Sequence, residues 1–187
     1  MTDFPNPATD VRVTRNLEAT QPRSQVNPRT VERARTLDQL EAQFLAIELR
    51  AQALIASAGA ELCNTIPAAE SWSATECLQH LNISSDAYFP IWQQIIANAG
   101  LRKTEMNAPY RTDFWGSLFS WILEPPSRIR SKTPVPFEPV MCGAIESVLA
   151  GFLDRQLRIV ATLHRCRGRA IDQVRMASPV DRRIRYS

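Results

Sequence analysis

The chain has 187 residues, of which 44% are hydrophobic and 22% are charged, a balance typical of one soluble globular domain. Its 22 basic and 19 acidic side chains give a formal net charge of +3, too little for the concentrated basic face of a nucleic-acid-binding protein. No apolar run approaches the roughly 18 residues of a membrane span, so we expect no membrane partner. The four cysteines form no CxxC pair and no signal peptide precedes them, which favours reduced, mostly buried thiols in a cytoplasmic protein.

The chain is expected to begin with a tail and a long helix. Residues 1–29 are rich in proline and polar residues without any period, which predicts a disordered tail before a domain over residues 30–187. The first helix is expected from Thr30, as N-cap, to Ser57, with Gly59 in a left-handed conformation at its end. Its apolar residues recur at intervals of three and four, which predicts one buried face. These residues are Leu37, Leu40, Phe44, Ile47, Ala51, Leu54 and Ala58.

The second predicted helix has the clearest start signal in the chain. Ser73 is followed three residues later by Glu76, so the two side chains fit a capping box. The helix is expected to run to about Ala99 and to end at Gly100. Pro90 lies inside it, and a proline there removes one backbone donor, which predicts a kink.

A short helix, a crossover and a third long helix follow. The segment 114–123, FWGSLFSWIL, is aromatic and apolar nearly all round, and we expect it to cap the mouth of a helical bundle, with contact to a membrane or partner as the alternative. The proline-rich crossover 124–139 is expected to be extended. The third long helix is predicted from Cys142 to Cys166, ended by Gly168, and the rest of the chain is expected to be a loop. Three amphipathic helices without a strand signal predict an all-α, up-down bundle that needs a fourth partner.

His80 is the candidate functional residue on the second helix. Helical spacing places it on a face with Glu76 and Cys77, beside the apolar stripe, so its imidazole can point into the bundle. On this evidence alone a core or boundary histidine with one hydrogen bond is the commoner case.

The segment WSATECLQHL, from Trp72 to Leu81, resembles the second-helix signature of the DinB-like superfamily: a tryptophan, a small N-cap residue, a glutamate and then His-Leu. The strings WILEPP at 121–126 and Ser-Pro at 178–179 resemble one bacterial branch of that superfamily. The resemblance covers about residues 30–187 and implies an up-down four-helix bundle. It also implies a divalent metal, zinc or nickel, on three histidines, one of which matches His80. Some relatives are thiol S-transferases or hydrolases.

In the family pattern the other two ligands form a His-x-x-x-His pair on a last helix, where an interval of four places both imidazoles on one face. This sequence has two histidines and no such pair, and it reaches Ser187 where that helix would begin. We therefore expect a C-terminally truncated bundle with an incomplete metal site that does not bind metal tightly by itself.

Other candidates are weaker. His164 does not match a family ligand and is expected to face the dipole at a helix C-terminus. Cys77 is expected to be a small core residue, although it lies close enough in sequence to His80 to share a metal. Cys166 is flanked by two arginines that lower a thiol pKa, but an ordinary surface thiol is the commoner case.

Two functions follow from these observations. The first is a metal-dependent enzyme of the transferase or hydrolase type, inactive by itself or dependent on a partner. The second is a non-catalytic helical module that associates through its uncovered apolar face, for example as a homo-oligomer.

Overall fold

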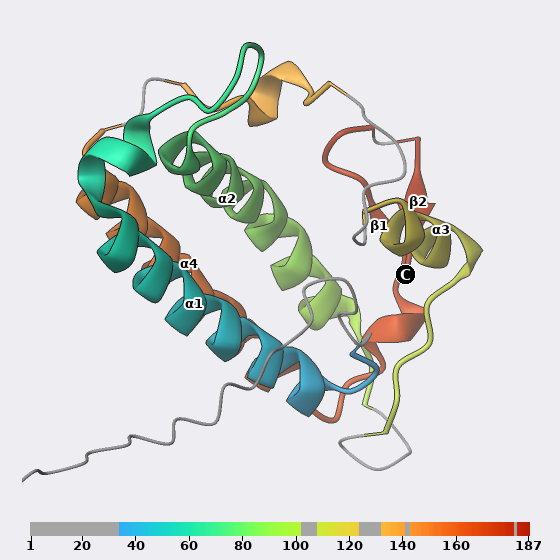
Figure 1. The fold of residues 1–187 in the computed structure, drawn as a ribbon. Coiled ribbons are helices and arrows are strands. Elements are labelled where there is room, and N and C mark those ends of the chain that lie inside the picture. The colour runs from blue at the N-terminus through green and yellow to red at the C-terminus, as the bar shows by residue number, and fades with distance from the viewer. Residues whose placement is uncertain (1–33, 102–107, 124–131, 141–142, 182) are drawn as a thin grey trace, which may run out of the picture.

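The computed structural model describes residues 34–101, 108–123, 132–140, 143–181 and 183–187. The expected tail over residues 1–29, the expected cap Thr30 and the expected helix start at Cys142 lie outside these ranges. The long helices are α1 (Leu37–Asn64), α2 (Ala74–Asn98) and α4 (Ile145–Cys166), and α3 (Phe114–Leu123) is short (Figure 1). This mostly helical fold confirms the all-α prediction. None of the described helices is both long enough and apolar enough to cross a membrane.

The start of α1 is set by a capping box that was not predicted. The Thr36 side chain accepts a hydrogen bond from the Gln39 backbone N–H, and the Gln39 side chain accepts one from the Thr36 N–H. Gly59 has the expected positive φ, at 76°, and interrupts α1 as predicted: the first helical segment ends at this kink, and a second segment, which was not predicted, continues to Asn64. Glycine allows this interruption because it has no Cβ to clash in that conformation.

The predicted start of α2 is confirmed. Ser73 Oγ accepts from the Glu76 N–H at 3.2 Å, and the Ser73 N–H donates to the Glu76 carboxylate at 2.7 Å. The helix continues on both sides of Pro90, whose ring is exposed. The bounds predicted for the short aromatic helix α3 are also confirmed.

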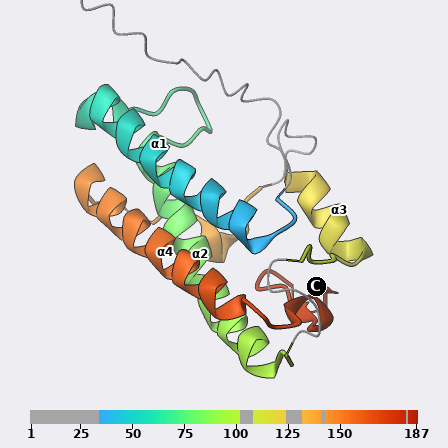
Figure 2. The ribbon, with the colours of Figure 1, turned by 90° about the horizontal axis from the view of Figure 1, so that it is seen from below.

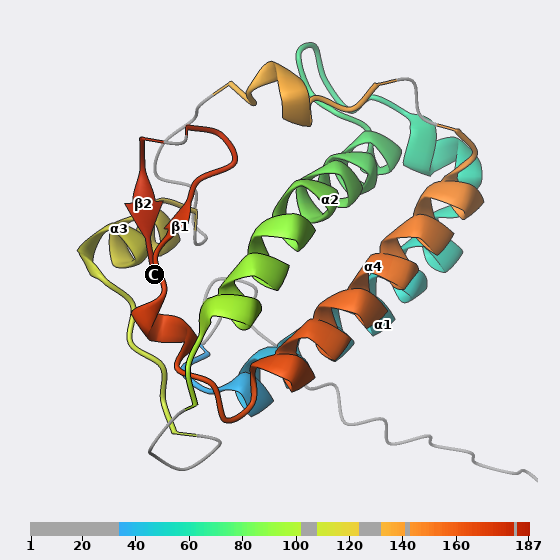
Figure 3. The ribbon, with the colours of Figure 1, turned by 180° about the vertical axis from the view of Figure 1, so that it is seen from behind.

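The three long helices are not equally paired. α4 packs along both α1 and α2, whereas α1 and α2 meet each other over a much shorter length (Figures 2 and 3). One core cluster, around Leu78, Val148 and Phe152, lies near the start of α4. A second cluster, around Leu37 and Ile96, lies near its end. α1 and α2 therefore lie side by side on α4 with little direct contact between them.

The region after α4 is not only a loop. Gly168 has the expected positive φ of 71°, but strands β1 (Met176–Ala177) and β2 (Arg185–Tyr186) then pair antiparallel. Two residues per strand are too few to show a period in the sequence, which explains the error. α3 packs against β2, so its contacts are with this hairpin and not across an end of the three long helices (Figure 1).

Candidate functional site

His80 lies in the second turn of α2 and is held by the crossover segment. Its Nδ1 is 2.8 Å from the carbonyl oxygen of Phe137, a buried residue at the end of the short 3₁₀ turn η1 (Val135–Phe137). Because a carbonyl only accepts hydrogen bonds, Nδ1 carries a proton, and in the neutral imidazole Nε2 is then the nitrogen with the lone pair. The Trp72 ring lies 5.1 Å from the imidazole, centroid to centroid, and limits its rotation. The imidazole is therefore fixed in one tautomer with Nε2 available as a ligand atom.

The residues nearest to His80 in sequence do not add metal ligands. The Glu76 carboxylate is engaged in the capping box with Ser73. Cys77 is exposed, so the expectation that it belongs to the core is wrong. Partial desolvation of its thiol by the neighbouring chain, and next the charge of Glu76, raise the pKa of Cys77 and disfavour the thiolate that binds metals. Within the described ranges, no three His, Cys, Asp or Glu side chains lie close enough to hold a metal ion. These residues alone do not provide the three-histidine metal site that the resemblance implies.

His164 lies in the last turn of α4, as expected, and faces α1. Its Nε2 is 2.9 Å from Glu41 Oε1, and Arg167 donates to the other oxygen of Glu41 at 2.8 Å. Arg167 also pairs with Asp38 at 2.5 Å. The hydrogen bonds from His164 and then from Arg167 lower the pKa of Glu41. This charged cluster joins the end of α4 to the start of α1 and serves the fold.

Cys166 is buried between α1, α2 and α4, in the cluster of Leu37 and Ile96. Burial raises the pKa of its thiol and outweighs the opposite effect of Arg165 and Arg169. The expectation of an ordinary surface thiol is therefore wrong, and so is the alternative of a thiol activated by neighbouring arginines. Flanking charges are visible in a sequence, but the burial that opposes them depends on packing.

The groove between α1, α2 and α4, here called the bundle groove, contains an apolar cavity of about 380 Å³. Its lining includes Leu40, Phe44, Trp92, Ile95, Ile159 and Leu163. The same helical faces continue beyond the cavity through Ile47 and Leu54 of α1 and Leu81 of α2. These side chains are 46%, 57% and 46% exposed, so the apolar surface of the bundle groove extends past its covered part.

Two buried amides lie where the helices meet. Gln156 and Asn82 are each only 4% exposed, and neither the Gln156 Oε1 nor the Asn82 Oδ1 has a hydrogen-bond partner among the described residues. The Asn82 amide nitrogen donates to the Val148 carbonyl at 3.1 Å. Gln156 follows Phe152 by one turn and precedes Ile159, so it belongs to the α4 face that looks into the bundle groove.

Comparison with known proteins adds no relative: no protein-family model, curated protein or solved structure matches the chain.

Proposed function

We propose that this chain is a DinB-like helical-bundle domain that contributes His80 to a divalent-metal site. The remaining ligands would come from a helix that packs in the bundle groove, next to the face of α2 that carries His80. By resemblance the associated chemistry is of the thiol S-transferase or hydrolase type. Three imidazoles leave one position of zinc or nickel open, and such a metal activates a bound water or thiol.

The hydrogen bond from His80 to the Phe137 carbonyl is the observation that carries the proposal. Histidines that ligate metals nearly always donate their second ring N–H to a carbonyl or carboxylate, which fixes the tautomer and the ring orientation. His80 has this arrangement, with Trp72 against its ring as a second restraint. His164 also has one ring nitrogen engaged, Nε2 with Glu41, but it lies in the last turn of α4, at the end of the bundle away from His80, which makes it a matched control.

The half-exposed residues of the bundle groove favour a second candidate function, a non-catalytic module that binds a second copy of this chain. Burying a large aliphatic side chain completely contributes about 1.5–3 kcal/mol. Ile47, Leu54 and Leu81 are already about half covered, so each would contribute roughly half of that in a complex.

The test extends the chain after Ser187, which itself lines the bundle groove, with an amphipathic helix carrying His-x-x-x-His. A control helix carries Gln-x-x-x-Gln in the same positions. Zinc binding is measured by equilibrium dialysis and the oligomeric state by light scattering. We expect one tightly bound zinc per monomer with the histidine helix and none with the glutamine helix.

The histidine variants of the extended chain decide between the outcomes. His80→Ala should abolish tight zinc binding, whereas His164→Ala should leave it unchanged. Retained zinc affinity in His80→Ala would exclude His80 as a ligand. If the extended chains are no more resistant to urea than the original chain, the helix does not occupy the bundle groove. If the original chain is a dimer, and both the histidine helix and the glutamine helix convert it to a monomer, the second candidate function, binding of a second copy, is favoured.

A further inference from the structure

A second cavity lies between α2 and the C-terminal hairpin and borders the cavity of the bundle groove, with which it shares Ile95, Val174 and Met176. The chain from Ala170 to Tyr186 is tied to α2, or to the residues just after it, at both ends. At one end the Ala170 N–H donates to the Gly100 carbonyl at 2.9 Å. At the other end the hydroxyl groups of Tyr186 and Tyr88 lie 3.2 Å apart. Between these attachments the hairpin stands away from the helix and leaves a cleft of about 630 Å³, within the usual range for small-molecule sites.

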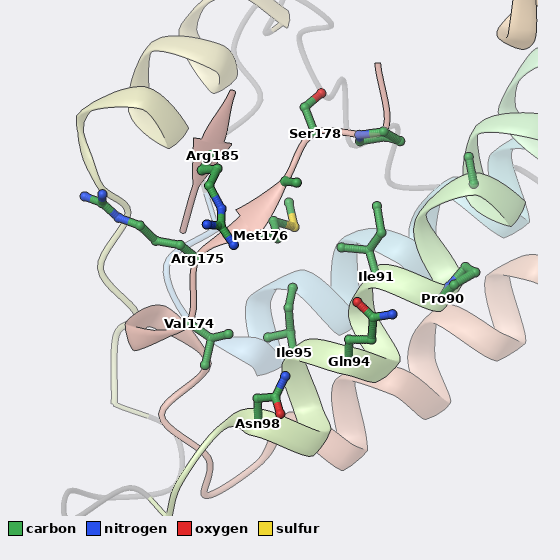
Figure 4. A pocket seen from close by; sticks show the side chains of 13 residues that line it. Pro90, Ile91, Gln94, Ile95, Asn98, Val174, Arg175, Met176, Ser178 and Arg185 are labelled. Atoms are coloured by element: carbon green, nitrogen blue, oxygen red, sulfur yellow. The ribbon is translucent and has the colours of Figure 1, made fainter. Parts of the chain in front are cut away.

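The cleft, here called the hairpin cleft, has an apolar floor with polar groups beside it. Figure 4 shows Ile91 and Ile95 of α2 opposite Met176 of the hairpin, with the amide of Gln94 on the same side as the two isoleucines. The amide of Asn98 lies one turn further along the helix. A ligand there would meet aliphatic surface in the middle and hydrogen-bonding groups at the edge.

Two arginines line the hairpin cleft, but they differ in their partners. Arg175 pairs with Asp113, Nε to Oδ2 at 3.6 Å, and its guanidinium points away from α2 in Figure 4. Arg185 has no ion pair within the described ranges, and the same view shows its guanidinium beside Met176. None of the described residues that line the hairpin cleft is acidic. The hairpin cleft therefore joins an unpaired cation to an apolar floor, which favours an anion over a cation.

We propose that the hairpin cleft binds a small organic acid, with its carboxylate on Arg185 and its apolar body on Ile91, Ile95 and Met176. A guanidinium presents parallel N–H donors that match the two oxygens of a carboxylate, and an apolar body gains by leaving water. A cationic ligand of the same length would place its charge against Arg185. The proposal requires no metal and is independent of the proposed role of His80.

The experiment uses the full chain and octanoate as the probe, with octan-1-ol and octylammonium as ligands of matched length. Binding is followed by ligand-observed NMR in the presence of EDTA. We expect saturable binding of octanoate at one site, weaker binding of the alcohol and none of the amine. Arg185→Gln should weaken octanoate binding about 10-fold or more, since it removes hydrogen bonds to a charged group. Ala87→Leu narrows the hairpin cleft and should weaken octanoate and octanol together.

Arg183→Gln is the matched control, because Arg183 is an exposed arginine two residues earlier that does not line the hairpin cleft. It should bind octanoate as the wild-type chain does, and far-UV circular dichroism should show that all variants fold. No saturable octanoate binding by the wild-type chain overturns the proposal. So does equal affinity for octanol, or equal loss in both arginine variants, which would indicate general attraction to a basic surface.

Discussion

Replacing Gln156 by methionine should stabilise the protein. The two side chains have similar length and similar helix propensity, so the substitution mainly removes a buried amide. Gln156 is 4% exposed and its Oε1 has no partner among the described residues. An unsatisfied buried acceptor costs about 1–3 kcal/mol, and the thioether of methionine does not carry this cost. We expect the free energy of unfolding to rise by about 1–2 kcal/mol, which for a domain of this size raises Tm by about 2–8 °C.

The measurement is urea unfolding at neutral pH, followed by circular dichroism. Gln93→Met is the control, because Gln93 is an exposed residue of α2 and its replacement should change stability by less than about 0.5 kcal/mol. A loss of 1 kcal/mol or more in Gln156→Met would refute the reasoning, because it would show that the amide makes hydrogen bonds in solution. A helix that occupies the bundle groove and places a hydrogen-bond donor against Gln156 should reduce or reverse the stabilisation by Gln156→Met.

Three further predictions concern the helix start, the thiols and the charged cluster. Ser73→Ala should lower the free energy of unfolding by about 1 kcal/mol in urea titrations, because it removes a capping hydrogen bond from α2. Cys77 should react with a thiol reagent in the native state, whereas Cys63 and Cys166, both buried, should react only after unfolding, as peptide mapping by mass spectrometry would show. The pKa of Glu41 is lowered in the fold, so this carboxylate adds stability above its unfolded pKa of about 4.5 and loses it as the pH falls. Glu41→Gln should therefore flatten the acid limb of the stability curve between about pH 5 and 3, and equal limbs would contradict this role.

The features predicted correctly from the sequence are those decided within one or two turns of chain. Ser73 and Glu76 are three residues apart, so their capping box depends on little else. The same signal is present at Thr36 and Gln39, six residues after the predicted cap Thr30, which shows that neighbouring candidates for a helix start are hard to rank from sequence. Thr36 and Gln39 are also three residues apart, and they form the same two hydrogen bonds as Ser73 and Glu76.

The features that were missed depend on contacts between distant segments. The Phe137 carbonyl that orients His80 is 57 residues away in the chain. The side chain of Phe137 does not indicate that its backbone carbonyl will accept a hydrogen bond from His80. The burial of Cys166 depends on packing by α1 and α2 and reverses the effect expected from its charged neighbours. Arg185 is one of several arginines near the C-terminus, and only the hairpin places it over the apolar face of α2.

The broad apolar surface of α2 connects these observations. A helix with one neighbour needs one apolar stripe, but α2 meets α4 through Leu78 and Phe89 and the bundle groove through Trp92. On a third face, residues at intervals of four, three and four line the hairpin cleft: Ala87, Ile91, Gln94 and Asn98. His80 precedes Ala87 by two turns on this same face. A metal at His80 and an acid in the hairpin cleft would therefore lie along the same side of α2. The two proposals are tested separately, but they concern adjacent parts of one surface.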